Sequence, residues 1–167
     1  DSALAGTWPA KPVKPFADDK QDFYRNAAQE ILQQSKQMSG YCLILGNGEG
    51  RLAAELADQS ELNILAVEPN EVKAEEARKR LEKAGLHGSR ITIVTCPMDE
   101  IPFSNYFANL IVSETHLKTG DLPCAANSVA RFVKPCGGVA LLGTVQRSRP
   151  SGQLLYVTCG YLNPKDK

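Results

Sequence analysis

Short apolar runs alternate with helical patterns of apolar and polar residues along most of this chain. The runs lie at residues 41–45, 63–67, 91–94, 110–112 and 139–142. Continuous apolar strands separated by helices are typical of a parallel sheet that is covered on both faces. We therefore predict an α/β fold with a doubly wound, mostly parallel sheet and helices on both faces.

The helical patterns have recognisable ends. Apolar residues as far as Met38 recur at near-helical spacing, which predicts a helix over roughly 19–38 that stops at Gly40. A long helix is expected between Asn70, a capping residue, and Gly85, a stop signal.

Two further helices complete the pattern. Leu52 and Leu56 belong to the buried stripe of a short helix, and another helix is predicted over 122–133. Three prolines among residues 1–17 predict an extended N-terminal arm, followed by a single α/β domain over residues 18–167.

Composition excludes several classes of protein. The 167 residues carry 19 basic and 19 acidic side chains, so the global charge gives no nucleic-acid or membrane signal. No apolar stretch is long enough to span a bilayer. Five cysteines without metal-site spacing argue against a metal centre, and Cys42, Cys96 and Cys159 are expected to behave as small buried hydrophobes.

A glycine-rich turn follows the first strand. Gly46, Gly48 and Gly50 bring backbone N–H groups close to a ligand, and Glu68, which closes the second strand, can bind a ribose diol. Arg51 stands where the dinucleotide fingerprint requires its third glycine. Two simpler interpretations stay open, namely a tight turn without ligand and a Glu68 that only caps the following helix.

Five segments in order resemble the motifs of the class I S-adenosylmethionine-dependent methyltransferases. They are residues 43–52, 66–70, 96–103, 107–114 and 132–138. The resemblance implies a Rossmann-like fold, S-adenosylmethionine as cofactor and a methyl acceptor of unknown identity. The family's last helix and hairpin have no clear counterpart after Gly143, where only a polar loop and one strand over 154–158 are predicted, so the C-terminal part is expected to be shortened.

The resemblance also implies a set of site residues. The glycine loop would hold the methionine end, Glu68 the ribose, and Met98 with Asp99 the adenine. The predicted cofactor-binding residues are Gly46, Asn47, Gly48, Gly50, Glu68, Met98, Asp99 and Ser113. Glu114 and His116, which follow the fourth strand, are candidate general bases for an acceptor that carries a proton. The alternative is that both are solvated turn residues.

Three departures from the family pattern favour a second hypothesis. Ile44, Pro97 and Asn109 stand where the family usually has acids, and neither of the first two side chains can accept a hydrogen bond. The chain would then be a catalytically inactive Rossmann-like domain that serves as an interaction or structural module. A nicotinamide-dependent dehydrogenase is a third option, which Arg51 disfavours.

We also expect this chain to be part of a longer polypeptide. The sequence begins at Asp1 without methionine, which suggests excision from a longer polypeptide whose other domains would be partners. Residues 52–57 and 156–161 resemble methyltransferase-like segments of large bacterial proteins that carry a quinoprotein-type β-propeller. The compartment would be the cytoplasm or, if the parent protein is exported, an extracytoplasmic space.

Overall fold

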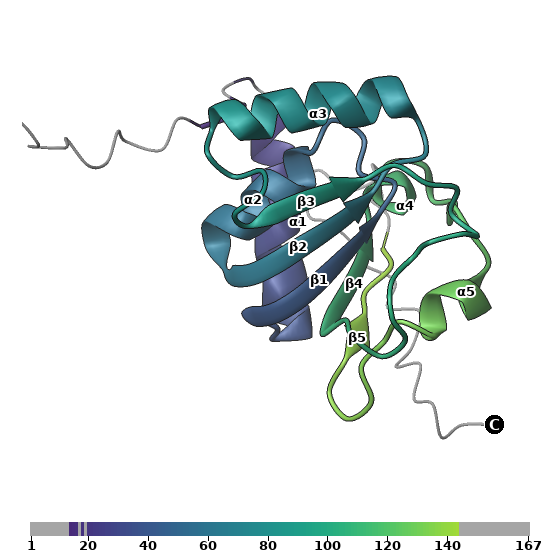
Figure 1. Ribbon diagram of the computed structural model, residues 1–167. Coiled ribbons are helices and arrows are strands. Elements are labelled where there is room, and N and C mark those ends of the chain that lie inside the picture. Colours follow the sequence, from purple (N-terminus) through teal and green to yellow (C-terminus); the bar gives the residue numbers. More distant parts are fainter. Residues whose placement is uncertain (1–13, 17, 19, 144–167) are drawn as a thin grey trace, which may run out of the picture.

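The computed structural model describes residues 14–16, 18 and 20–143, and these contain a five-stranded sheet in the order β3-β2-β1-β4-β5 (Figure 1). The strands are β1 (Ser39–Leu45), β2 (Glu61–Val67), β3 (Ile91–Val94), β4 (Leu110–Ser113) and β5 (Val139–Ala140). Every neighbouring pair is parallel, which confirms the predicted parallel sheet.

Five helices accompany the strands within the described residues. They are α1 (Lys20–Ser35), α2 (Arg51–Gln59), α3 (Glu71–Lys83), α4 (Glu114–Thr119) and α5 (Ala126–Ala130). The prediction of a helix over 122–133 was too long, because the helical part is confined to the five residues of α5. The short helix α4 was not predicted at all.

The end of α1 also differs from the prediction. The helix stops at Ser35, and Lys36 then takes a left-handed conformation with φ of 56° while its N–H bonds to the Leu32 carbonyl. Met38 is therefore not part of the buried stripe and is 51% exposed. Gly40 lies inside β1 rather than at the helix end, so its assignment as a stop signal was wrong.

The predicted capping signals of α3 are confirmed. Asn70 is the N-cap, and its side chain accepts a hydrogen bond from the N–H of Lys73 at 3.0 Å. Gly85, with φ of 71°, follows the C-cap Ala84. A capping side chain accepts a hydrogen bond from a backbone N–H that has no partner within the helix, and so it fixes where the helix starts. Because Asn70 is the N-cap, α3 starts close behind the end of β2.

The sheet divides the core into two layers. Alternate residues of a strand face opposite sides, so Cys42 and Ile44 of β1 pack with α1, α2 and α3, while Leu43 and Leu45 face the other way. On that second side the covering layer is α5 and the segment between β3 and β4, with Ile101 and Phe132 in its core. The predicted helices on both faces are thus confirmed.

Some expectations concern residues outside the described part. The strand over 154–158, the polar loop before it, most of the N-terminal arm and Cys159 all lie there. Cys42 is fully buried, as expected, and Cys96 is half-buried. Among the described residues, no helix combines the length and apolar character that crossing a bilayer requires, and no cluster of His, Cys, Asp or Glu could hold a metal ion.

Candidate functional site

The strand register brings three segments together at one edge of the sheet. Leu45, the last residue of β1, is paired with Val67 of β2 on one side and with Ser113 of β4 on the other. The chain runs outward from β1 through β2 to β3 and then crosses to β4 on the other side of β1, so the strand order reverses here. Ligands of open α/β sheets bind outside the carboxyl ends of the strands at such a switch point. The segments that follow these strand ends therefore lie side by side (Figure 1), and the turn after β1 contacts both Glu68 and Glu114.

The glycine turn is held against β2 by backbone hydrogen bonds. The N–H groups of Gly46 and Asn47 both donate to the Val67 carbonyl, at 2.9 and 3.1 Å. Gly46, Gly48 and Gly50 have φ of 68°, 56° and 83°. Left-handed backbone is unfavourable for residues with a Cβ, so the turn depends on glycine at these positions.

Glu68 joins the turn to the start of α3. Its Oε2 accepts a hydrogen bond from the Gly48 N–H at 2.7 Å, and its Oε1 accepts one from the Asn70 N–H at 3.1 Å. Both interpretations of this acid thus have a structural counterpart, since it contacts the N-cap residue and the glycine turn. A carboxylate has about four acceptor positions, so two of them remain for another donor.

Within the glycine turn, the side chain of Asn47 is buried and lacks hydrogen-bond partners among the described residues. It is 0% exposed, and neither its amide oxygen nor its amide nitrogen has a hydrogen-bond partner in the described part of the chain. A buried polar group without a partner costs about 1 to 3 kcal/mol. Such groups call for an explanation, and a ligand or an ordered water is the usual one.

The start of α4 packs against the same turn. The Ser113 hydroxyl donates to the Leu45 carbonyl at 2.9 Å and accepts from the His116 N–H at 3.1 Å, so it ties β4 to β1 and caps α4. A Cβ at Gly46 would lie 2.0 Å from Oγ1 of Thr115. Ser113 was predicted to bind the cofactor, and here its hydroxyl already has two structural partners.

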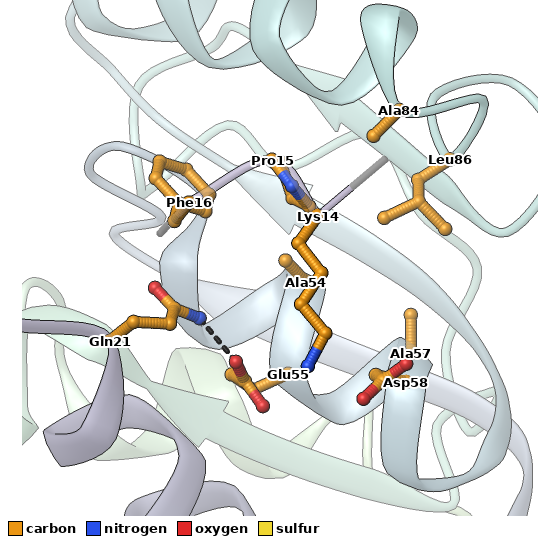
Figure 2. Close-up of a pocket in the computed structure, with 10 residues that line it drawn as sticks. All are labelled: Lys14, Pro15, Phe16, Gln21, Ala54, Glu55, Ala57, Asp58, Ala84 and Leu86. Atoms are coloured by element: carbon orange, nitrogen blue, oxygen red, sulfur yellow. Dashed lines mark hydrogen bonds between the residues drawn. The ribbon is translucent and has the colours of Figure 1, made fainter. Parts of the chain in front are cut away.

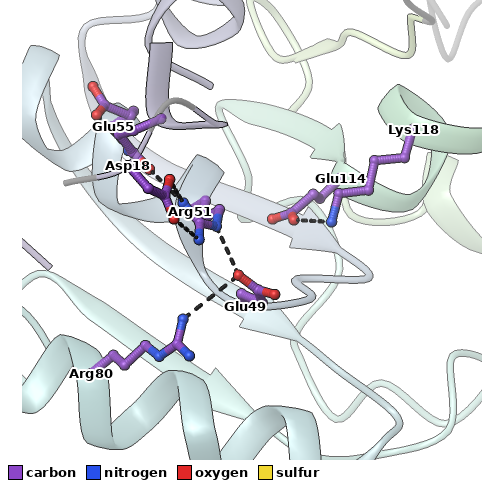
Figure 3. Close-up of polar contacts among 8 residues, drawn as sticks. Asp18, Glu49, Arg51, Glu55, Arg80, Glu114 and Lys118 are labelled. Carbon is purple, nitrogen blue, oxygen red and sulfur yellow. Dashed lines mark hydrogen bonds and ion pairs between the residues drawn. The ribbon is translucent and has the colours of Figure 1, made fainter. Parts of the chain in front are cut away.

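An ion pair with a buried carboxylate and a partly exposed lysine lies beside Gly48. Glu114 is 0% exposed, and its Oε1 lies 2.7 Å from Nζ of Lys118, one helical turn later (Figure 3). Burial raises the pKa of Glu114 to about 7, although Lys118 opposes that rise. Burial alone would lower the pKa of Lys118, but the charge and hydrogen bond of Glu114 outweigh it and raise that pKa above its usual range.

The other predicted site residues lie in less enclosed places. Met98 is 9% exposed and belongs to the core layer under α5, whereas Asp99 is exposed in a turn closed by a hydrogen bond from the Glu100 N–H to the Pro97 carbonyl. His116 is half-buried, and its Nδ1 has no partner among the described residues. The alternative of a solvated turn residue does not describe Glu114, which is enclosed.

The three residues that depart from the family pattern lie in three different environments. Ile44 is 0% exposed and packs in the core layer under α1 and α2, while Pro97 is exposed. Oδ1 of Asn109 accepts a hydrogen bond from the Tyr41 N–H at 3.2 Å and so supports the backbone of β1. Ile44 is thus a core residue, and its side chain packs under α1 and α2.

A second charged network was not foreseen from the sequence. Arg51, 6% exposed at the start of α2, donates to both carboxylate oxygens of Asp18 at 2.6 and 2.7 Å, and its Nε donates to Glu49 at 2.7 Å (Figure 3). Its guanidinium also stacks 4.5 Å from the Phe16 ring centroid. Hydrogen bonding to Arg51 lowers the pKa of both Asp18 and Glu49. This network fixes the segment before α1 to the glycine turn.

A cavity of about 200 Å³ lies elsewhere, between the segment before α1 and the helical layer (Figure 2). Its polar lining includes Gln21 and Glu55, which are hydrogen-bonded to each other. None of the predicted site residues lines it. The cavity is therefore separate from the site at the carboxyl ends of the strands.

The strand order, the glycine turn and the acid that closes β2 define a Rossmann-like domain. The chain belongs to the methyltransferase domain family, whose model matches residues 42–137. The search of curated proteins found no match.

Solved structures support this assignment. A Methanococcus maripaludis protein, provisionally assigned as an S-adenosyl-L-methionine-dependent methyltransferase, is 29% identical, with a TM-score of 0.66 over 74% of this chain and 56% of its own. Geranyl diphosphate C-methyltransferase from Streptomyces coelicolor A3(2), solved with S-adenosyl-L-homocysteine, is 15% identical, with a TM-score of 0.61 over 71% and 44%. The cyclase SpnF is 19% identical, with a TM-score of 0.62 over 79% and 47%.

The chain spans about half the length of these solved proteins. The last two likenesses show the fold alone, and a cyclase among them illustrates that one fold carries more than one reaction. The fold alone therefore does not determine a reaction.

Proposed function

We propose that this domain binds S-adenosylmethionine at the carboxyl ends of β1, β2 and β4 and serves a methyl transfer to an unidentified acceptor. The observation that carries the proposal is the position of Glu68, whose buried carboxylate bonds to the glycine turn and keeps free acceptor positions. The family membership and the likeness to the Methanococcus maripaludis protein support it.

The residues present fit the nucleoside part of this cofactor. The two ribose hydroxyls are donors, and Glu68 has acceptor positions left after its bonds to Gly48 and Asn70. Asn47 brings a buried amide without a partner into the same turn. Met98 and Asp99, in the turn after β3, remain the residues proposed for the adenine.

The cofactor, when bound, supplies a methyl group on a sulfonium, which passes to a nucleophilic atom of the acceptor while the sulfur leaves as a neutral thioether. The work of the chain is then to hold the acceptor in line, to exclude water and to take up a proton where the acceptor carries one. Of the two predicted bases, His116 is the better proposal for that last task. Glu114 is enclosed and already paired with Lys118.

The proposal is tested by calorimetric titration of the protein with S-adenosylhomocysteine, the product form of the cofactor. We expect saturable binding with a one-to-one stoichiometry. An absence of binding up to about 1 mM, which corresponds to a free energy weaker than about −4 kcal/mol, would contradict it and favour the inactive module. Binding of NADH in its place would revive the dehydrogenase.

The parent polypeptide is a separate proposal. The resemblance of residues 52–57 and 156–161 to segments found beside quinoprotein-type β-propellers supports an origin in such a multidomain bacterial protein. The open reading frame around the coding sequence tests this. A frame without propeller repeats would refute it.

A further inference from the structure

The ion pair of Glu114 and Lys118 lies directly against the glycine turn. A Cβ placed on Gly48 would be 2.9 Å from Oε1 of Glu114 and 3.3 Å from Nζ of Lys118. One carboxylate and one ammonium group thus stand side by side at the turn that is proposed to hold the cofactor (Figure 3).

The pair is shielded unequally from water. The Glu114 side chain is 0% exposed, whereas that of Lys118 is 41% exposed and can move outward. Tyr24 of α1 closes the pair from the helical side, with Nζ of Lys118 5.6 Å from its ring centroid. Lys118 can therefore leave its present position without unfolding α4, while Glu114 must keep a partner where it stands.

Glu114 has structural contacts besides Lys118, because hydrogen bonds with Tyr24 and with the backbone of Leu52, in the first turn of α2, also lower its pKa. These contacts concern the carboxylate and do not require a lysine at position 118. Desolvation of a buried ion pair often outweighs its attraction, and apolar residues of the same size commonly serve a core as well or better. The pair also packs directly on the glycine turn, since a Cβ at position 48 would lie 2.9 Å from Oε1 of Glu114. The location and the exposure point to recognition rather than to packing.

The amino-acid end of S-adenosylmethionine is a zwitterion, with an α-ammonium and an α-carboxylate. An anion of the protein can pair with the α-ammonium, and a cation can pair with the α-carboxylate. Because the zwitterion has no net charge, its binding leaves the net charge of the site unchanged. The strand β1 cannot provide the anion, because Cys42, Leu43, Ile44 and Leu45 are apolar and 0% exposed.

We propose that Glu114 and Lys118 are the recognition pair for this zwitterion, in which Glu114 takes the α-ammonium and Lys118 turns to the α-carboxylate. The inference rests on the proposed function. On binding, Glu114 exchanges the ammonium of Lys118 for the α-ammonium of the ligand, and Lys118 exchanges the carboxylate of Glu114 for the α-carboxylate. The buried carboxylate of Glu114 therefore always has a cation beside it. Without cofactor, the ammonium of Lys118 takes the place of the ligand's ammonium beside Glu114.

Two ligands separate this role from a merely structural one. S-adenosylhomocysteine carries the zwitterion, whereas 5′-deoxy-5′-methylthioadenosine keeps the nucleoside and the thioether without it. In calorimetric titrations, Glu114→Gln and Lys118→Met should each weaken binding of S-adenosylhomocysteine about tenfold or more, the effect of losing a hydrogen bond between charged groups. Binding of methylthioadenosine should not change.

The chain contains a matched control. Glu75 and Lys79 form another pair at the same spacing, on the exposed face of α3 with a 3.4 Å contact. Glu75→Gln and Lys79→Met should leave both affinities unchanged.

The outcomes are distinguishable from a failure of the proposed function. If the unaltered protein binds neither ligand, the proposed function fails. If it binds both, but Glu114→Gln and Lys118→Met leave S-adenosylhomocysteine unaffected or weaken both ligands equally, the recognition pair is refuted and the proposed function stands. Should the variants not fold, the unaltered protein can be titrated with an analogue of S-adenosylhomocysteine that lacks the α-amino group, and an undiminished affinity would refute the role of Glu114.

Discussion

Oε2 of Glu68 accepts a hydrogen bond from the backbone N–H of Gly48 across 2.7 Å, although 20 residues separate them in sequence. This bond connects the acid that ends β2 with the turn that follows β1. It orients one carboxylate oxygen, and it shows that the turn and the acid form one unit rather than two independent loop features.

Replacement of Glu68 by alanine should weaken binding of S-adenosylhomocysteine by about 1.5 to 3 kcal/mol, or roughly ten- to hundredfold, because a charged acceptor for the ribose is lost. Titration calorimetry measures this. Glu61→Ala, an exposed acid at the opposite end of the same strand, is the control and should bind as before. Equal affinities of the Glu68 variant and the unaltered protein would show that Glu68 only holds the turn.

Gly46→Ala should destabilise the fold more than Gly85→Ala does. The two glycines have nearly equal φ, 68° and 71°, so the strain of about 1 to 2 kcal/mol for left-handed backbone is common to both. A Cβ at position 85 meets nothing within 4 Å, whereas one at position 46 collides with Thr115, which adds about 1 to 3 kcal/mol. Urea denaturation measures both free energies of unfolding. Equal losses would mean that α4 does not press on the turn.

The layered sheet could be predicted because its signals are local. Buried strands read as apolar runs, and Asn70 with Gly85 marks the ends of α3 through backbone hydrogen bonds within a few residues. The predicted end of α1 was wrong, because the helical spacing of apolar residues continues in sequence beyond the last residue of the helix. Met38 continues the stripe of α1 in sequence, but a left-handed Lys36 ends the helix before it.

The site was only partly predictable. The glycine turn and Glu68 belong to a motif, so sequence alone brings them together. Arg51 and Asp18 pair over 33 residues, and no local pattern indicates which of the 19 acids meets which of the 19 bases. The i, i+4 spacing of Glu114 and Lys118 was a usable signal for α4, but only the packing of α4 on Gly48 reveals that the pair is buried.

Arg51→Met should release the segment before α1 from the glycine turn and lower the free energy of unfolding. The folded-state pKa values of Asp18 and Glu49 are depressed by hydrogen bonds to Arg51, so this stabilisation is present above their ordinary values of 3.8 and 4.5 and is lost as the pH falls further. We therefore expect the variant to differ from the unaltered protein at pH 7 and to approach it in acid.

Chemical denaturation at a series of pH values measures this difference. Arg80→Met is the control, since Arg80 is half-exposed and lies farther than Arg51 from both partners, 3.6 Å from Glu49 and 5.6 Å from the Phe16 ring centroid. A pH-independent difference would assign the effect of Arg51 to its stacking on Phe16 rather than to its carboxylate partners.

Glu114 should make the protein less stable as the pH rises from about 4.5 to about 7. Burial raises its folded-state pKa to about 7, so in this window the folded state holds a proton that the unfolded state has lost. Rising pH therefore costs up to about 3 kcal/mol, since each unit of pKa shift corresponds to about 1.4 kcal/mol. Below pH 4.5 the group is protonated in both states and contributes nothing.

Glu114→Gln isolates this contribution, because an amide resembles the protonated acid and does not titrate. The titratable groups around Glu114 are Lys118 on the same helix, the neutral Tyr24 of α1, whose pKa is raised, and Glu49 of the glycine turn, on which Lys118 also acts. All three remain in the variant, and Lys118 can reach solvent once its partner is neutral. Urea denaturation should give equal free energies of unfolding near pH 4 and a variant that is more stable at pH 8. The opposite order at pH 8 would mean that the ion pair stabilises the fold by itself, which would remove the argument that its position serves a ligand.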